Sequence, residues 1–196
     1  MTVPIGGVIL AGGRSSRFGR DKLAEPIDGR PMLDHAVRAV QAVATDVLVV
    51  AAPGADPTLP EGVRLARDLL AFEGPLAGLA AGLAELDPAV DRVIVVAGDM
   101  PTLVPAVLVR LLEALDAVDA PVDAVTLEAD GHSVPLPLAV RRAAGALAAG
   151  ELLAGGERRL RALPVALRSH IIPEAIWRRD DPDGRTLHDI DTPADV

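Results

Sequence analysis

A glycine-rich segment near the amino end of the chain combines a flexible backbone with concentrated positive charge. The segment is Leu10-Ala-Gly-Gly-Arg-Ser-Ser-Arg-Phe-Gly-Arg-Asp-Lys22, with cations at Arg14, Arg17, Arg20 and Lys22 and one carboxylate at Asp21. Gly12 and Gly13 let backbone N–H groups approach a ligand closely, and such a turn can hold a phosphate or meet the edge of a base. The formal net charge of the chain is −9, so this local excess of cations predicts a specific anionic ligand.

Lys22 is the only lysine in a chain whose other basic residues are all arginine. Arginine presents a planar fork, whereas lysine is a compact charge on a flexible stem that can follow a phosphate oxygen. Two familiar phosphate loops do not fit, because there is no Gly-x-Gly-x-x-Gly and Lys22 neither follows a glycine directly nor precedes Ser or Thr. Lys22 is therefore a candidate phosphate contact, and the alternative is a solvated surface lysine.

Acidic residues follow two of the expected strands. Asp99 comes directly after the apolar run Val93-Ile-Val-Val96, where a carboxylate can join Mg²⁺ to substrate phosphates or simply form a turn. Asp68 ends another expected strand and can accept hydrogen bonds from a ribose or base, or cap a turn. Near the carboxyl end, Asp189 and Asp191 would face one side of an extended strand. They are candidate metal ligands, although Asp191 also suits the start of a helix.

Composition excludes several other kinds of chemistry. The chain has no cysteine, and its four histidines form no metal-ligand pattern, so disulfides, thiol nucleophiles and zinc are not expected. The negative net charge opposes binding to nucleic acid. No leader segment and no apolar run of membrane-spanning length is apparent, which predicts a cytoplasmic protein without a membrane partner.

Hydrophobic periodicity predicts strands alternating with helices. Half of the residues are hydrophobic but only 2% are aromatic, so the core must consist of Val, Leu, Ile and Ala. We expect strands at 4–10, 47–51, 63–66, 92–97, 123–127, 134–140 and 165–170, and helices at 32–43, 76–86, 105–115, 141–149 and 157–163. Pro135 and Pro137 suggest an edge position for their strand.

This alternation predicts an α/β fold. We expect a single-domain, Rossmann-like three-layer sandwich over residues 1–196, with a mostly parallel, mixed central sheet. Residues 1–101 form the expected nucleotide-binding part, and 102–196 form an acceptor-binding part that completes the sheet. Ligands bind such sheets at the carboxyl ends of the strands, near the switch point, which is where the glycine-rich segment and Asp99 fall.

The motifs together resemble a known family. Leu10-Ala-Gly-Gly-x-Ser-x-Arg17-x-Gly-x-Asp-Lys22, Gly74-Pro-Leu-Ala-Gly78, Gly98-Asp99-Met-Pro101 and Asp191-Thr-Pro193 resemble, in order and spacing, the molybdenum cofactor guanylyltransferase (MobA) family of nucleotidyltransferases. The resemblance implies that Mg²⁺-bound GTP donates GMP to molybdopterin or molybdenum-molybdopterin, releasing pyrophosphate. It also implies contact with other proteins of molybdenum cofactor biosynthesis.

The resemblance also assigns roles to residues. It implies that Leu10, Ala11 and Gly12 meet the guanine, that Lys22 meets the phosphates, that Asp68 contacts the nucleoside, and that Asp99 binds magnesium. Gly13 is expected to belong to the same nucleotide-binding set, and Arg17 is a candidate catalytic residue with Lys22 and Asp99. The family has asparagines where this chain has Asp189 and Asp191, and it has an asparagine that the loop Ala51-Ala-Pro-Gly54 lacks. The alternatives are transfer from CTP to molybdopterin, transfer from a nucleoside triphosphate to a sugar phosphate, and a regulatory module that binds a nucleotide without catalysis.

Overall fold

The structure is a computed structural model that describes residues 4–12, 21–67, 74–117 and 121–190. Its centre is a seven-stranded sheet of order β5-β4-β1-β6-β8-β7-β9, and a small second sheet pairs β2 with β3. The strands are β1 (Ile5–Ala11), β2 (Pro26–Ile27), β3 (Arg30–Pro31), β4 (Asp46–Ala51), β5 (Val63–Arg67), β6 (Arg92–Ala97), β7 (Ala124–Ala129), β8 (His132–Arg141) and β9 (Ser169–Ile172). The helices are α1 (Met32–Gln41), α2 (Pro75–Glu85), α3 (Pro105–Leu115), α4 (Arg142–Ala154), α5 (Ala162–Ala166) and α6 (Glu174–Trp177), with 3-10 turns η1 (Lys22–Ala24) and η2 (Arg185–Leu187).

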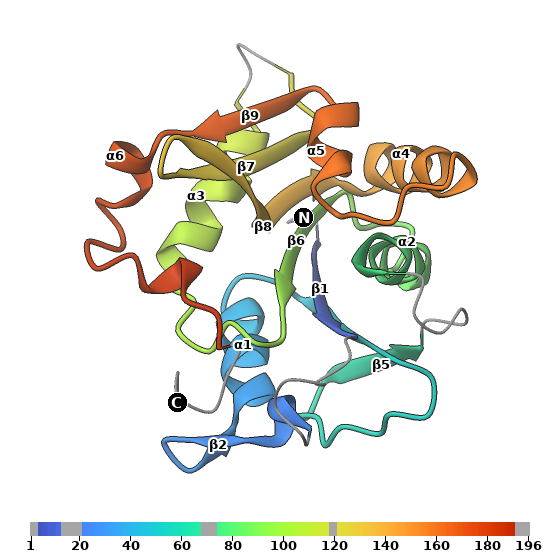
Figure 1. Cartoon of the computed structure of the whole chain (residues 1–196), viewed down its shortest axis with the longest axis vertical. Coiled ribbons are helices and arrows are strands. Elements are labelled where there is room, and N and C mark those ends of the chain that lie inside the picture. The colour runs from blue at the N-terminus through green and yellow to red at the C-terminus, as the bar shows by residue number, and fades with distance from the viewer. Residues whose placement is uncertain (1–3, 13–20, 68–73, 118–120, 191–196) are drawn as a thin grey trace.

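Helices cover both faces of the sheet (Figure 1). Helices α1 and α3 pack on one face, against side chains such as Ile9 and Val96, and α2 and α4 pack on the other, against Val8 and Val95. Because successive residues of a strand point to opposite faces, an unbroken apolar run such as that of β6 supplies both cores at once. The structure confirms the predicted mixed, mostly parallel α/β sandwich.

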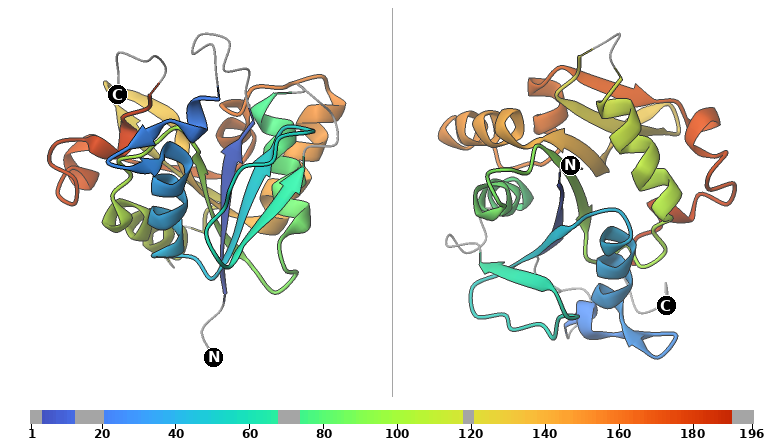
Figure 2. Two further views of the ribbon diagram at one scale, coloured as in Figure 1. Left: turned by 90° about the horizontal axis from the view of Figure 1, so that it is seen from below. Right: turned by 180° about the vertical axis from the view of Figure 1, so that it is seen from behind.

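The sheet is parallel except at one strand. β1 pairs in parallel with β4 and β6, and β4 pairs in parallel with β5. β8 runs antiparallel to both β6 and β7, while β9 is parallel to β7. The carboxyl ends of β1, β4, β5 and β6 therefore share one edge of the sheet, which is the upper edge in the left view of Figure 2.

The prediction of an edge position for the strand with Pro135 and Pro137 is wrong. β8 lies inside the sheet, between β6 and β7. Its pairs with β6 run only from Arg141 to Leu138, and its register with β7 shifts over the stretch that holds both prolines. A bulge leaves ladder positions without a partner, so the missing N–H groups of the two prolines break no hydrogen bond.

The predictions for residues 157–170 are also partly wrong. The expected helix at 157–163 is shifted to α5, and the expected strand at 165–170 begins only at Ser169. The side chain of Glu157 accepts hydrogen bonds from the N–H groups of Arg158 and Arg159, at 2.8 and 2.9 Å. Such local bonds compete with helix formation, so the helix begins later in the chain.

No helix within the described residues is long and apolar enough to cross a membrane.

Candidate active site

The carboxyl edge of the sheet has a switch point between β1 and β6. From β1 the chain proceeds to β4 and β5 on one side and then returns to β6 on the other, as the strand order shows. The loop after β6 is fastened to β1 there, because the N–H of Gly98 donates to the carbonyl oxygen of Leu10 at 3.0 Å. The connections that leave the two strands run in opposite directions at such a point, which leaves space for a ligand beyond the strand ends.

Lys22 and Asp99 meet at this edge. The Nζ atom of Lys22 lies 2.6 Å from Oδ2 of Asp99, although 77 positions separate the two residues in sequence. Lys22 begins η1, and the side chain of Asp21 caps that turn by accepting the N–H of Leu23 at 3.1 Å. Asp99 follows β6 directly. The structure therefore brings together two residues that the sequence had singled out separately.

A third segment completes this contact. The Nζ atom of Lys22 also donates to the carbonyl oxygen of Ile190 at 3.2 Å, and the N–H of Ile190 donates to the carbonyl oxygen of Asp99 at 3.0 Å. Ile190 was not predicted from the sequence, since a backbone group leaves no signal there. Asp189 directly precedes Ile190 in the chain and is exposed.

The charges at this site suit a ligand that carries both anionic oxygens and a hard cation. The side chains of Lys22 and Asp99 are 17% and 22% exposed, so each remains within reach of solvent and of a ligand. Among the described residues, no group of three or more His, Asp or Glu side chains is arranged to hold a metal ion. Mg²⁺ commonly uses one or two protein carboxylates and takes its other ligands from phosphates and water. Asp99 fits that pattern, and Asp189 precedes Ile190, whose N–H donates to the carbonyl oxygen of Asp99.

The glycine-rich segment is described as far as Gly12. A Cβ atom built at Gly12 would meet no atom within 4 Å, and this residue is exposed at the end of β1. Leu10 and Ala11 are the last two residues of β1 and directly precede Gly12. Gly13, Arg17, Asp68 and Asp191, which the sequence also predicts as site residues, lie outside the described residues.

The Gly74-Pro-Leu-Ala-Gly78 run positions α2 beside this loop. Gly74 has a φ of +90°, and a Cβ atom there would lie 2.8 Å from the carbonyl oxygen of Arg158, so this position excludes a side chain. Pro75 occupies the first helical turn, where its missing N–H costs nothing. Gly78 faces Leu10 and Val50, each 3.7 Å from its added Cβ. The run thus has a packing role that is independent of any base contact.

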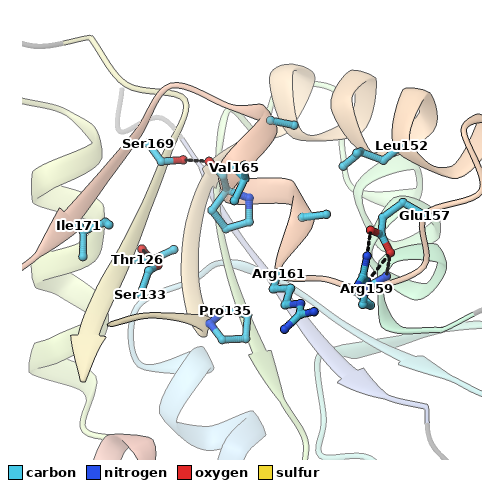
Figure 3. Close-up of a pocket in the computed structure, with 13 residues that line it drawn as sticks. Thr126, Ser133, Pro135, Leu152, Glu157, Arg159, Arg161, Val165, Ser169 and Ile171 are labelled. Atoms are coloured by element: carbon cyan, nitrogen blue, oxygen red, sulfur yellow. Dashed lines mark hydrogen bonds and ion pairs between the residues drawn. The ribbon is translucent and has the colours of Figure 1, made fainter. Parts of the chain in front are cut away.

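A pocket of ≈ 650 Å³ opens on the face of the sheet that carries α4 and α5 (Figure 3). Its floor includes Thr126 and Ser133, whose hydroxyls lie 2.9 Å apart, and its walls are mostly apolar. Pro135, on β8, also lines it. Since Leu138 pairs with Val95, the part of β8 before Leu138 extends toward the carboxyl edge of β6. The pocket therefore approaches the same edge as the Lys22–Asp99 pair.

Two arginines line the pocket and differ in their bonding. Arg159 donates from Nε and from Nη2 to the Glu157 carboxylate, at 2.9 and 2.7 Å, and this ion pair holds the pKa of Glu157 well below its usual range. Arg161 has no hydrogen-bonding or ionic partner among the described residues. Figure 3 shows its side chain apart from the Arg159–Glu157 pair. Arg161 is therefore the guanidinium that remains available to an anionic ligand.

The segment 157–159 connects this pocket with the start of the glycine-rich segment. The carbonyl oxygen of Arg158 accepts the N–H of Leu76 at 3.4 Å, at the start of α2. Helix α2 in turn lies against Leu10 through Gly78. A continuous path of contacts therefore joins the pocket wall to the end of β1.

The fold and the comparisons with known proteins together define the class of this protein, which is a nucleotidyltransferase. The chain belongs to the family described as the MobA-like NTP transferase domain, whose model matches residues 7–170. This family membership confirms the resemblance that the sequence motifs indicated.

Named relatives cover most of the chain. A protein of Chloroflexus aggregans named "Probable molybdenum cofactor guanylyltransferase" is 35% identical over 97% of this chain and 90% of its own length. A Mycobacterium tuberculosis protein of the same name is 40% identical over 83% of this chain and 80% of its own length. A Burkholderia vietnamiensis protein named "Molybdenum cofactor guanylyltransferase" is 35% identical over 83% of this chain and 82% of its own length.

Solved structures share the fold. Molybdopterin-guanine dinucleotide biosynthesis protein A from Archaeoglobus fulgidus superposes with a TM-score of 0.76 at 22% identity, covering 97% of this chain and 94% of that one. The 2-C-methyl-D-erythritol 4-phosphate cytidylyltransferase from Thermus thermophilus gives a TM-score of 0.68 at 20% identity, covering 100% and 95%. At these identities the likeness concerns the fold, which enzymes named for different acceptors share.

Proposed function

We propose that this protein transfers GMP from GTP to molybdopterin, with or without molybdenum, and releases pyrophosphate in a reaction that depends on Mg²⁺. The observation that carries the proposal is the meeting of Lys22 and Asp99, 2.6 Å apart, at the switch point beyond β1 and β6. A cation for phosphates and a carboxylate for a metal are the two groups that this chemistry requires at one place. The names of the relatives support guanylyl transfer and the role in molybdenum cofactor biosynthesis.

The task of the protein in this reaction is alignment and neutralisation of charge. The attacking group is a phosphate of the acceptor and the leaving group is pyrophosphate, so both partners are anions and no general base is needed. Lys22 would turn its ammonium from Asp99 to the phosphates of GTP, while the Ile190 carbonyl retains one of its three donors. Arg17 is proposed as a second phosphate contact from the same glycine-rich segment.

Asp99 would hold magnesium, with Asp189 and Asp191 as further candidates. When bound, the ion would screen the repulsion between the phosphates and stabilise the negative charge that develops on the leaving group. The carboxylate of Asp99 must then exchange its partner, from the ammonium of Lys22 to the metal. Loading with metal and transfer of Lys22 to the nucleotide are therefore coupled through one ion pair.

The guanine would lie beside Leu10, Ala11 and Gly12, with Asp68 on the nucleoside. Within the described residues no atom lies within 4 Å of a Cβ built at Gly12, which supports this assignment because a flat base can approach an unobstructed backbone. Backbone groups would then pair with the guanine edge. A site that pairs polar groups rejects bases that leave those groups buried and unpaired, at about 1–3 kcal/mol for each group.

The acceptor would occupy the pocket on the α5 face. Its volume, ≈ 650 Å³, suits a small organic ligand, and its apolar walls suit a flat heterocycle. Arg161 has no partner among the described residues, so its guanidinium would be available for the phosphate of the acceptor. The pocket also approaches the carboxyl edge at which Lys22 and Asp99 meet.

The experiment is a transfer assay with purified molybdopterin and a panel of GTP, CTP and ATP, each with Mg²⁺. We expect pyrophosphate release and formation of the guanine dinucleotide with GTP only. Equal turnover with CTP would move the protein to cytidylyl transfer, and turnover with a sugar phosphate in place of molybdopterin would change the acceptor. Binding of a nucleotide without turnover with any acceptor would contradict the proposal and indicate a regulatory module.

A further inference from the structure

We infer that Thr186 and Asp181 are positioning residues for the nucleotidyl-transfer site. They would act through the C-terminal strap, defined here as residues 180–190, which carries the Ile190 backbone to Lys22 and Asp99. The inference rests on the proposed function for its kinetic consequence, but its structural basis is a set of hydrogen bonds that do not depend on that function.

The first half of the strap is fastened to the start of α3. The hydroxyl of Thr102 donates to the carbonyl oxygen of Arg185 at 2.7 Å, and the N–H of Val104 donates to Oγ1 of Thr186 at 3.2 Å. Farther along the helix, Arg110 forms an ion pair with Asp180. The strap is thus bonded both to the loop between β6 and α3 and to α3 itself.

Thr186 and Asp181 form the centre of this attachment. The N–H of Thr186, which lies in the 3-10 turn η2, donates to Oδ2 of Asp181 at 2.7 Å. Thr186 has no exposed surface and Asp181 is 3% exposed, in a protein whose other fully buried side chains are almost all apolar in the described part. Buried polar groups of this kind fix one arrangement, because any other arrangement leaves a donor or an acceptor unpaired.

The other end of the strap reaches the reacting groups. Ile190 accepts from Nζ of Lys22 and donates its N–H to the carbonyl oxygen of Asp99. The Gly98–Val104 loop is therefore bound to the strap at Asp99, at Thr102 and at Val104. Since Asp99 and Lys22 both contact Ile190, a displaced strap would change the distance between the ammonium and the carboxylate.

The test removes one hydroxyl while preserving side-chain volume. Thr186→Val deletes the acceptor for the Val104 N–H, and Thr186→Ser keeps it. Two measurements apply, namely hydrogen exchange of the Ile190 amide in the free protein, and steady-state transfer kinetics with their dependence on Mg²⁺. We expect faster exchange at Ile190 in Thr186→Val, a loss of kcat of about 10- to 100-fold with a smaller change in the KM for GTP, and a higher Mg²⁺ requirement. Thr186→Ser should show the wild-type exchange rate, kcat and Mg²⁺ requirement.

A matched control separates positioning from lost stability. Val93→Ala creates a cavity in the amino half of β6, far along the strand from Asp99, and should lower stability without accelerating exchange at Ile190. If Thr186→Val does not fold, Thr102→Val removes only the bond to Arg185 and takes its place. Because the exchange measurement uses no substrate, it decides on the strap even if the wild type transfers no GMP.

Two results would overturn the inference. One is unchanged exchange at Ile190 in Thr186→Val, or in Thr102→Val where that variant replaces it. The other is a kcat and Mg²⁺ requirement no different from those of Val93→Ala in an otherwise active enzyme.

Discussion

The ion pair between Lys22 and Asp99 predicts that one substitution will improve nucleotide binding and damage catalysis. In the free protein the Lys22 ammonium is held by Asp99, so a triphosphate that binds without metal must compete with that carboxylate. Asp99→Asn removes the negative charge and leaves a neutral acceptor of similar shape. We expect this variant to bind GTP more tightly than the wild type in the absence of Mg²⁺, and to lose Mg²⁺-dependent turnover.

The magnitude follows from the geometry of the pair. A hydrogen bond to a charged group contributes about 1.5–3 kcal/mol. The two side chains are 17% and 22% exposed, so solvent screening reduces the ionic part, and the asparagine keeps a neutral bond. We take about 1–2 kcal/mol as released, which corresponds to roughly 5- to 30-fold tighter binding. Loss of the metal ligand should meanwhile lower turnover by roughly 10² to 10³, the usual cost of one electrostatic contact to developing charge.

Calorimetric titration of GTP in EDTA, and again with Mg²⁺, measures the first effect, and the transfer assay measures the second. Asp91→Asn is the control for net charge, since Asp91 pairs with Arg141 at the opposite, amino edge of the sheet. The gain in binding must also vanish in the Lys22→Ala background, because no ammonium then remains to be released. Metal-free GTP binding that Asp99→Asn leaves unchanged or weakens would refute the competition, and so would a gain that persists without Lys22.

Four further changes test the remaining assignments. Lys22→Ala should lower transfer by roughly 10² to 10³ and Lys22→Arg should also impair it, as assayed by pyrophosphate release, whereas normal turnover in both would exclude a phosphate contact. Gly12→Ala should fold normally, because its methyl group meets no atom within 4 Å, yet weaken GTP binding or shift base preference in nucleotide titrations. Arg161→Ala should raise the KM for the acceptor by roughly 10- to 100-fold without changing that for GTP. Arg179→Ala, in the turn after α6 and not among the residues that line the pocket, should change neither. Burial alone would raise the pKa of Asp181, but hydrogen bonds from Thr186 bring that pKa below its ordinary value of 3.8. The contribution of the ionised carboxylate to stability should therefore be complete above about pH 4 and be lost as the pH falls further. Thermal melts as a function of pH measure this loss, and Asp181→Asn should abolish it.

The sequence predicts the elements whose hydrophobic runs are long and unambiguous. β6 and α3 have the bounds that periodicity gives, because a run such as Val93-Ile-Val-Val96 is buried on both faces and leaves no choice of face. Prediction failed where local bonding overrides periodicity. Glu157 holds its own downstream N–H groups and delays a helix, and a bulge accommodates Pro135 and Pro137 inside the sheet.

The candidate site was predictable through its side chains and not through its backbone. Lys22 and Asp99 stood out because each is a charged residue at the end of an expected strand or loop, and parallel strands bring their carboxyl ends together. Ile190 was missed because 168 positions separate it from Lys22 and its contribution is a peptide group, which every residue possesses. The same holds for Thr186 and Asp181, whose importance depends on burial that composition does not reveal.

The glycines of the Gly74–Gly82 stretch and Gly12 have two different physical roles, and the difference bears on base preference. A Cβ atom at Gly82 would lie 2.8 Å from Val8, and one at Gly74 would meet the Arg158 carbonyl, so these glycines permit close packing of α2. A Cβ atom at Gly12 would meet none of the described residues within 4 Å, so packing against the described part of the chain gives no reason for a glycine there. The preference for a purine should accordingly depend on Gly12, while the Gly74–Gly78 run acts through the placement of Leu10 beside it. Substitution at Gly82 should destabilise the protein, whereas substitution at Gly12 should weaken GTP binding or shift base preference without destabilising it.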